Sequence, residues 1–161
     1  MKRVHMTPEG KKSLEEELDH LEGVARFKII KDIEEARAHG DISENSEYED
    51  AKNRQAMCEG RIQDIKAKLS LAQVIDAKEN MPPPGVDKSV IFGCTVMVEG
   101  EDGVELTYKI VGVDEADVKK GKISYQSPLG RALIGKGEDD EVKFTAPKGL
   151  RVFEVIEIRY E

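Results

Sequence analysis

Two carboxylates stand three residues apart in a short acidic turn of this chain, and they could take part in phosphodiester chemistry. The turn reads Gly40-Asp41-Ile42-Ser43-Glu44-Asn45-Ser46-Glu47-Tyr48. Asp41 and Glu44 offer oxygen ligands of the kind that magnesium prefers, and they could also orient a water for attack on phosphorus. Two carboxylates bind magnesium weakly, because the ion keeps its own waters and needs further ligands. If this pair acts in catalysis, another molecule must supply the rest of the site.

The same spacing also has a structural interpretation. An Asp-x-x-Glu pattern before a helix is typical of a capping box, with Asp41 as the cap and Glu44 reaching back to the backbone. Spacing alone favours the cap, and a cap can still be presented to a partner. What the cap leaves unexplained is the length of the two helices that carry the turn.

The segment before the turn is predicted to be one long helix. Thr7 can cap it, Pro8 suits the first helical position, and Glu9 favours the positive end of the helix dipole. The helix is expected to end at His39-Gly40. Apolar residues recur along it with helical spacing, namely Leu14, Leu18, Leu21, Ala25, Ile29, Ile30, Ile33 and Ala36.

The segment after the turn follows a strict heptad pattern, formed by Tyr48, Ala51, Gln55, Cys58, Ile62, Ile65, Leu69 and Ala72. Two such helices joined by a short turn pack antiparallel, because each needs a partner for its apolar face. At a rise of about 1.5 Å per residue the hairpin would be roughly 45 Å long. The sequence therefore predicts an antiparallel coiled-coil domain over residues 1–79, with its acidic tip at residues 40–48.

The second half of the chain has a different period. Residues 80–87 contain three consecutive prolines and are predicted to be a linker. Residues 88–161 are predicted to form a small domain with strands near residues 90–92, 95–98, 106–113, 123–125, 142–144 and 150–160. One short helix is expected after Ser127 as cap, with Pro128 at its first position. The fold class is thus α+β, a helical hairpin followed by a small α+β domain.

Composition limits the classes of function. The 161 residues carry a net charge of -8, with 36% charged and 5% aromatic residues. Neither half has a basic surplus, which argues against free binding to duplex DNA. No apolar signal segment follows Met1, and no apolar stretch approaches the ~20 residues of a membrane span. Cys58 and Cys94 lack metal-site spacing and are expected to be buried thiols. We expect a soluble, cytoplasmic monomer that does not bind a membrane.

Basic residues flank the acidic turn. Arg37, Lys52 and Arg54 could form a positive patch suited to a nucleic-acid backbone. The alternative is an ordinary solvated helix face with partners four residues away. His39 is expected to be a helix-end residue rather than a catalytic base, and Tyr48 a packing residue.

The turn and its flanks resemble the tip motif of the bacterial Gre transcript cleavage factors. The resemblance is carried by residues 36–48, continues at 58–62 and 72–76, and extends to 90–93, 110–112, 114–117, 127–130 and 133–136. It covers nearly the whole chain in register. It implies an N-terminal antiparallel coiled coil and a C-terminal FKBP-like domain.

The resemblance also implies a partner, bacterial RNA polymerase. In this family the globular domain docks at the rim of the secondary channel, and the coiled coil reaches the active centre. The two tip acids then help to hold a second magnesium and its water there. The polymerase itself cleaves the extruded 3' end of the nascent RNA after backtracking, so the factor is not an enzyme and has no cofactor of its own.

Several residues of this chain match positions with roles in the family. Asp41 and Glu44 match the tip acids, and Arg37 and Lys52 fall at the basic patch that contacts the extruded RNA. Lys52 stands where an Arg is expected, which keeps the charge and loses bidentate geometry. The segment that meets the polymerase rim corresponds to Ser127, Pro128, Leu129 and Gly130.

Three other functions remain as alternatives. A channel inhibitor without cleavage activity would carry an altered tip, whereas Asp41 and Glu44 are intact. A coiled-coil chaperone or tether would not need this acidic turn. A prolyl isomerase would need an apolar pocket lined by aromatic residues, and the few aromatic residues here stand mostly at positions that favour packing.

Overall fold

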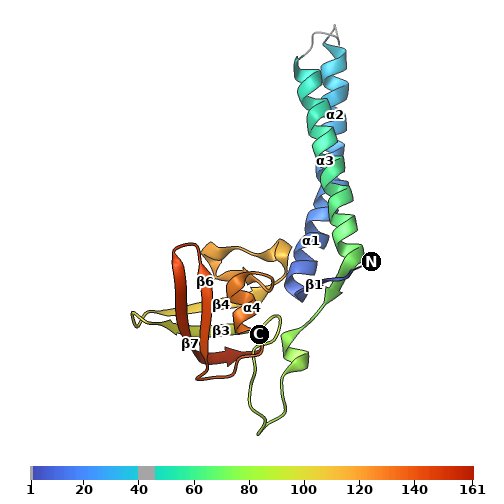
Figure 1. Ribbon diagram of the computed structural model, residues 1–161. Coiled ribbons are helices and arrows are strands. Elements are labelled where there is room, and N and C mark those ends of the chain that lie inside the picture. Colours follow the sequence, from blue (N-terminus) through green and yellow to red (C-terminus); the bar gives the residue numbers. More distant parts are fainter. Residues whose placement is uncertain (1, 40–45) are drawn as a thin grey trace. The chain divides into compact units, whose positions relative to one another are not determined.

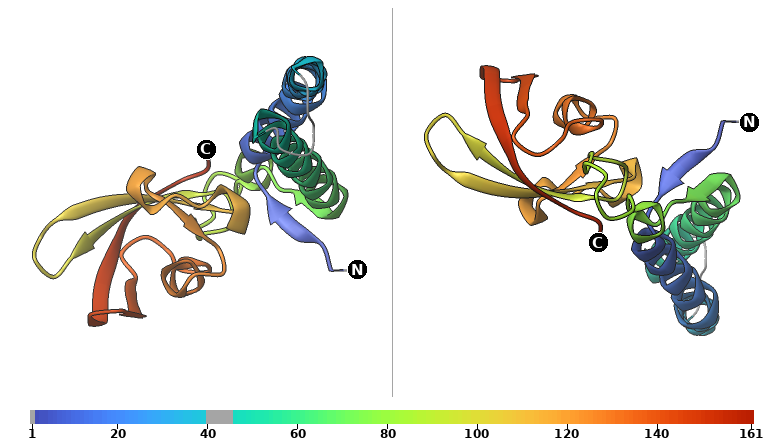
Figure 2. Two further views of the ribbon diagram at one scale, coloured as in Figure 1. Left: turned by 90° about the horizontal axis from the view of Figure 1, so that it is seen from above. Right: turned by 90° about the horizontal axis from the view of Figure 1, so that it is seen from below.

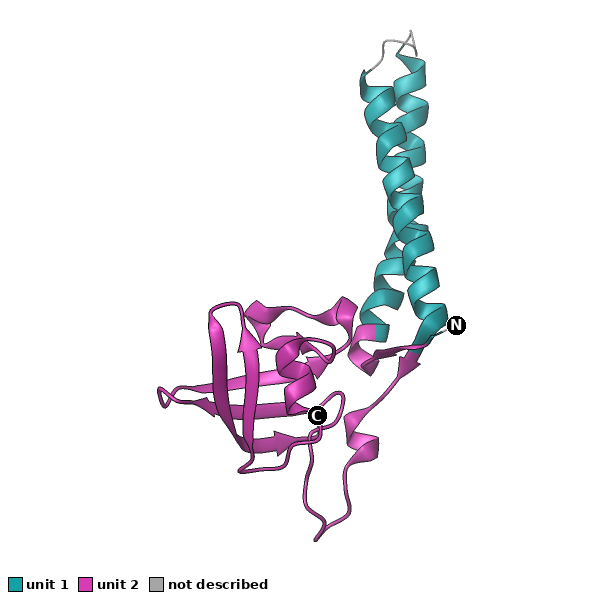
Figure 3. Cartoon of the chain, in the orientation of Figure 1, with its two compact units in different colours: residues 1–2, 11–72 teal, residues 3–10, 73–161 magenta. Residues whose placement is uncertain are grey.

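The structure is a computed structural model that describes residues 2–39 and 46–161. The chain forms two compact units, residues 1–2 with 11–72 and residues 3–10 with 73–161 (Figure 3). The first is a helical hairpin and the second is built on a β-sheet. This confirms the predicted α+β class with the hairpin first, whereas the more specific FKBP-like assignment stays a prediction.

The hairpin begins with α1 (Pro8–His20), continues through a π-helical turn (Leu21–Ala25) into α2 (Arg26–Ala38), and returns along α3 (Ser46–Leu71). The two arms lie side by side in all views (Figures 1 and 2). The predicted helix start is confirmed, because the Thr7 hydroxyl accepts a hydrogen bond from the Gly10 amide at 3.1 Å.

A single apolar seam joins the arms. Its buried members are Ile29, Ile33, Ala51, Cys58 and Ile62, and Leu18, Leu21, Ala25 and Tyr48 pack against them. These residues were expected from the helical spacing of the sequence. Within the described part of the hairpin, the faces turned away from the seam are largely exposed and rich in charged side chains.

The π-helical turn has a cause in the sequence. In α3 the apolar steps alternate between three and four residues, but the first arm has three successive steps of four, from Leu21 to Ala25, Ile29 and Ile33. The first arm therefore holds one residue more than the heptad pattern needs. The turn absorbs it with a hydrogen bond from the Arg26 amide to the Leu21 carbonyl, five residues back.

Ion pairs link the two arms beside the seam. Arg61 makes a two-point contact with Glu17 at 2.6 and 3.0 Å, and Arg26 makes one with Glu59 at 2.8 and 3.0 Å. Such paired contacts fix orientation better than a single lysine contact does. The hydrogen bond from Arg61 lowers the pKa of Glu17 below its ordinary 4.5.

The second unit contains a five-stranded sheet in the order β5-β4-β3-β7-β6. Its strands are β3 (Thr95–Gly100), β4 (Glu105–Val111), β5 (Lys122–Ser124), β6 (Glu141–Ala146) and β7 (Gly149–Arg159). All neighbours are antiparallel except β4 and β5, which are parallel. The helix α4 (Pro128–Leu133) contributes to the same core as the sheet, through Leu129 and Leu133.

Two expected elements differ in the structure. Residues 90–92 were expected to be a strand, but Val90 and Ile91 are irregular and a turn begins at Phe92, with the Val90 amide bonded to the Lys136 carbonyl at 2.8 Å. Val90 is buried there by packing, so its apolar character does not require a ladder. The heptad pattern extends to Ala72, whereas the chain leaves the helix at Leu71 and pairs β2 (Ala72–Val74) with β1 (Val4–Met6).

Both cysteines are buried, as expected, and burial raises the pKa of the Cys94 thiol.

A 3₁₀ helix (Ala77–Asn80) precedes the proline segment. Within the described residues, no helix combines the length and apolarity needed to cross a bilayer.

Deleting Gly23 is expected to remove the surplus residue and restore a continuous α-helix. Gly23 has open space around it, so the deletion sacrifices no packing. We expect a rise in melting temperature of a few degrees, since about 1 kcal/mol shifts Tm by roughly 2–4 °C in a chain of this size. Gly23→Ala, which keeps the residue count, is the control, and a lower melting temperature for the deletion would show that the surplus is absorbed elsewhere.

The Glu17–Arg61 pair predicts a pH dependence. Because the folded state lowers the pKa of Glu17, the pair stabilises the fold above pH 4.5 and loses its effect as pH falls below that value. Glu17→Gln should therefore lower the melting temperature at pH 7 and make less difference at pH 3. Asp19→Asn, at an exposed acid of the same helix, is the control. Equal losses at both pH values would contradict this account.

Candidate functional site

The acidic turn lies between the end of α2 and the start of α3. Asp41 and Glu44 fall outside the described residues, so their assignment as a pair of ligands stays a prediction. What the structure describes is the stem on either side, from Ala36 to His39 and from Ser46 onward. His39 stands at the C-cap of α2, in line with its expected place as a helix-end residue.

The stem brings the two arms close together through small residues. Ala36 is 3% exposed and Ala51 is fully buried, so the helices approach without large side chains between them. Tyr48 packs against the seam, as expected, and the Arg37 guanidinium lies over its ring at 5.8 Å from the centroid. This cation–π contact connects the last turn of α2 to the first turn of α3. It therefore joins the two arms of the hairpin beside the acidic turn.

The three basic residues near the turn differ in their surroundings. Arg54 donates to Asp32 of the other arm at 2.9 Å and to Asp50 of its own helix at 3.2 Å, and the hydrogen bond to Asp32 raises its pKa. Its charge is thus engaged within the hairpin, as the solvated-face interpretation expects. Lys52 is exposed and donates to the neutral amide oxygen of Gln55 at 3.0 Å.

The exposed cations nearest the turn are therefore Arg37 and Lys52. Both side chains are accessible to solvent; Arg37 lies over the Tyr48 ring, and Lys52 donates to the neutral amide oxygen of Gln55. A phosphate could approach either side chain from solvent. Their role toward RNA stays a prediction.

The segment expected to dock contains both exposed and buried residues. The Ser127 hydroxyl accepts from the Gly130 amide at 3.0 Å and donates to the Ser124 carbonyl at 2.7 Å, which confirms the predicted cap. Pro128 is exposed, whereas Leu129 and Gly130 are buried. A partner could therefore touch Pro128 and part of Ser127, while Leu129 and Gly130 support the segment from beneath.

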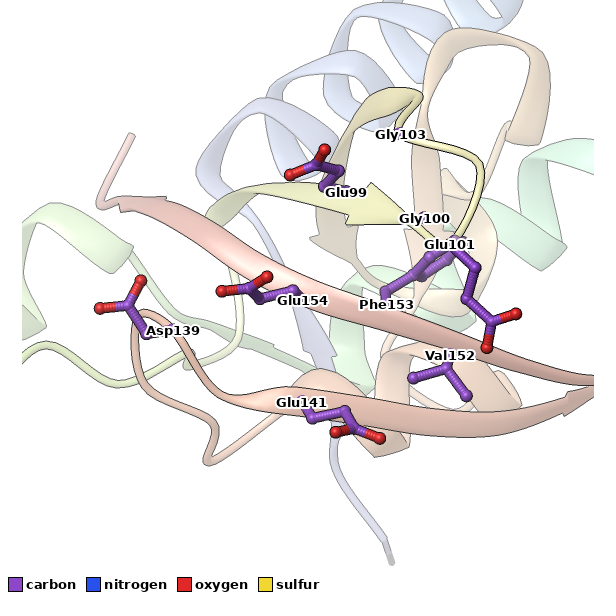
Figure 4. A pocket seen from close by; sticks show the side chains of 9 residues that line it. All are labelled: Glu99, Gly100, Glu101, Gly103, Asp139, Glu141, Val152, Phe153 and Glu154. Carbon is purple, nitrogen blue, oxygen red and sulfur yellow. The ribbon is translucent and has the colours of Figure 1, made fainter.

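A cavity of about 520 Å³ opens on the sheet side of the second unit (Figure 4). It is lined by acidic residues, two glycines, Val152 and the nearly inaccessible Phe153; the acids are Glu99, Glu101, Asp139, Glu141 and Glu154. Strand register also places Glu105, Glu99, Glu154 and Glu141 in one row across β4, β3, β7 and β6. This cavity is not the aromatic-lined apolar pocket that a prolyl isomerase needs.

No resident metal site is present in the described part of the chain. Over residues 2–39 and 46–161, no three His, Cys, Asp or Glu side chains are grouped so that they could hold an ion. Two carboxylates at the turn would leave most of the coordination shell of magnesium to other ligands.

Comparisons with known proteins match both halves of the chain. Residues 4–74 match the family profile described as transcription elongation factor, N-terminal, and residues 85–160 match that described as transcription elongation factor, GreA/GreB, C-term. A transcription elongation factor GreA of Syntrophotalea carbinolica is 51% identical over 158 residues, covering 98% of this chain and 97% of the relative. One of Haemophilus influenzae is 51% identical over 161 residues, covering 99% of each chain.

Solved structures are similar over the same length. The GreA factor homolog 1 of Thermus thermophilus is 28% identical, covers 98% of this chain and 99% of its own, and has a TM-score of 0.43. A prokaryotic transcription elongation factor GreA/GreB from Nitrosomonas europaea is 23% identical, covers 98% of this chain and 100% of its own, and has a TM-score of 0.42.

Proposed function

Because this chain belongs to the GreA/GreB family of transcription elongation factors, we propose that it stimulates RNA cleavage by stalled bacterial RNA polymerase. In this proposal the hairpin enters the secondary channel of the polymerase in the bacterial cytoplasm, and the acidic turn reaches the active centre. The observation that carries the proposal is the long hairpin with an intact Asp41/Glu44 pair at its turn. The chain is an elongation factor, and the polymerase would perform the chemistry.

The hairpin is suited to delivering side chains into a narrow space. It is only two helices wide, its arms are held by one seam and flanking ion pairs, and its stem is closed by Ala36, Ala51 and the Arg37–Tyr48 contact. A rod of this kind would hold the residues at its end in position while remaining narrow. Preorganisation of this sort matters because catalytic groups lose much of their effect when displaced by about 1 Å.

The acidic pair would supply ligands rather than a complete site. Asp41 and Glu44 would add oxygen ligands and orient a water at the polymerase centre. Magnesium bound there would stabilise the attacking and leaving oxygens of an in-line displacement. Arg37 and Lys52 would contact the phosphates of the extruded 3' end.

An inhibitor that occupies the same channel without promoting cleavage is the second candidate. The intact acidic pair favours the cleavage factor, because an inhibitor has no use for two metal ligands at its tip. Both candidates dock on polymerase, so only an assay of cleavage separates them.

Replacing both tip acids, Asp41→Ala with Glu44→Ala, is expected to abolish stimulated cleavage and retain docking. The loss should be at least about 10²-fold, the size typical of removing a group that acts in the transition state. The measurement is the rate of magnesium-dependent shortening of RNA in backtracked polymerase. Glu49→Ala, at an exposed acid of the first turns of α3, is the matched control. The inactive variant should still compete with the parent factor, and cleavage at the parent rate would refute the assigned role.

Pro128→Glu is expected to weaken docking without affecting the fold. The side chain is exposed, and Glu is well tolerated near a helix N-terminus. The factor concentration for half-maximal cleavage should rise about tenfold, which corresponds to 1.4 kcal/mol. The maximal rate should be unchanged. Replacing Ser127, Pro128 and Leu129 together should weaken docking as well, but it should also lower the melting temperature, because Leu129 is buried. An unchanged half-maximal concentration for Pro128→Glu would remove this surface from the proposal.

A further inference from the structure

One side chain of the globular unit, Glu115, holds the beginning of α1. Its Oε2 atom accepts hydrogen bonds from the Thr7 amide at 3.0 Å and from the Gly112 amide at 2.9 Å. Its Oε1 atom accepts a hydrogen bond from the Thr7 hydroxyl. Hydrogen bonds to a carboxylate are roughly twice as strong as those between neutral groups. Three of them therefore converge on one charged group.

The contact continues into the helix through Thr7. The Thr7 hydroxyl, which donates to Glu115, accepts from the Gly10 amide at 3.1 Å and so caps α1. Thr7 is 2% exposed, yet its donors and acceptor are satisfied by this arrangement. A carboxylate beside the first turn also favours the positive end of the helix dipole. Carboxylate, hydroxyl and amide thus form one chain of hydrogen bonds from the 112–115 turn to the helix.

Two glycines provide the space for this arrangement. A Cβ atom at Gly10 would lie 2.2 Å from Cδ of Glu115, and one at Gly112 would lie 2.6 Å from the His5 carbonyl oxygen. Any side chain at Gly10 would have to displace the carboxylate, which is fixed by three bonds. The close approach explains why glycine stands at both positions. All of these residues belong to the unit formed by residues 3–10 and 73–161.

The helix that starts here continues into the hairpin. α1 runs without interruption from Pro8 to His20, and α2 then leads to the acidic turn. We propose that Glu115 is a positioning residue: by holding Thr7 and the first turn of α1, it anchors the beginning of the arm that leads to Asp41 and Glu44. This inference rests on the proposed function. It assigns a role to the 114–117 motif, which neither the acidic turn nor the docking segment explains.

A purely structural role makes a different prediction. If Glu115 only stabilised the fold, its loss would reduce the folded fraction, and adding more factor would restore the full rate. If Glu115 positions the arm, docked factor is itself less effective. The maximal cleavage rate at saturation would then fall, while the half-maximal concentration would change little. The maximal cleavage rate and the half-maximal concentration, measured together, therefore distinguish the two roles.

The test compares Glu115→Ala with the parent on backtracked polymerase. We expect the maximal rate to fall about fivefold, the equivalent of roughly 1 kcal/mol, with the half-maximal concentration within about twofold of the parent. Glu101→Ala, at an exposed acid of the same unit, is the control and should behave as the parent. A parent-like maximal rate for Glu115→Ala overturns the inference.

A double replacement gives a result that general destabilisation would not. Gly10→Ala alone should lower the maximal rate, because the new methyl group displaces the carboxylate. In the Glu115→Ala background the same change meets no carboxylate, and alanine favours the helix. The double variant should therefore be no slower than Glu115→Ala. Additive losses would show that the two residues act independently and would contradict the inference.

Amide exchange supplies a readout besides activity. In Glu115→Ala the amides of Thr7 and Gly112 should exchange about tenfold faster, since each loses a bond to a charged group. Exchange in the body of α3 should be unchanged. If Glu115→Ala does not fold, Gly10→Ala carries the same kinetic and exchange tests.

The outcomes also separate this inference from the proposed function. If the parent factor does not stimulate cleavage, the proposed function fails. If the parent cleaves and the tip variant does not, yet Glu115→Ala reaches the full rate, only the positioning role fails.

Discussion

A two-helix hairpin can bury only one seam, and this limit governs the first unit of the molecule. In the described part of the hairpin each arm has a narrow apolar stripe, and the two stripes meet around Ile29, Ile33, Cys58 and Ile62. The stripe alone leaves rotation of the arms weakly fixed. Two-point contacts between arginine and glutamate on its flanks restrict that rotation. The hairpin therefore combines a narrow cross-section with fixed packing of its arms, which the proposed entry into the polymerase channel would require.

Much of the fold follows from periodicity, and the exceptions have physical causes. The helical and alternating patterns predict the hairpin and most strands, and the caps at Thr7 and Ser127 follow from side-chain type. The strand predicted at residues 90–92 was wrong because a buried irregular segment can be as apolar as a strand. Ala72 continued the heptad spacing, yet pairing of β2 with β1 satisfies its backbone instead. The π-helical turn was visible only as a drift in the apolar spacing, since local sequence does not say how a surplus residue is absorbed.

The candidate site was predictable to a smaller extent. The sequence places Asp41, Glu44, Arg37 and Lys52 around one turn, and it cannot say which cations are already paired. The structure shows that Arg54 is engaged by Asp32 across the hairpin, a contact between residues far apart in sequence. Glu115 could not be assigned for the same reason, because its partner Thr7 lies 108 positions away. The sequence thus identifies functional residues that stand close together along the chain, but it does not reveal contacts between residues that are far apart in it.

The row of glutamates across the sheet implies that salt affects the two units in opposite directions. Glu105, Glu99, Glu154 and Glu141 face like-charged neighbours on adjacent strands, an arrangement that costs free energy. Dissolved ions screen exposed charges beyond a Debye length of about 8 Å at physiological ionic strength. Raising the ionic strength should relieve repulsion in the sheet while weakening attraction between the arms of the hairpin. Higher ionic strength should therefore stabilise the sheet of the second unit and destabilise the hairpin of the same chain.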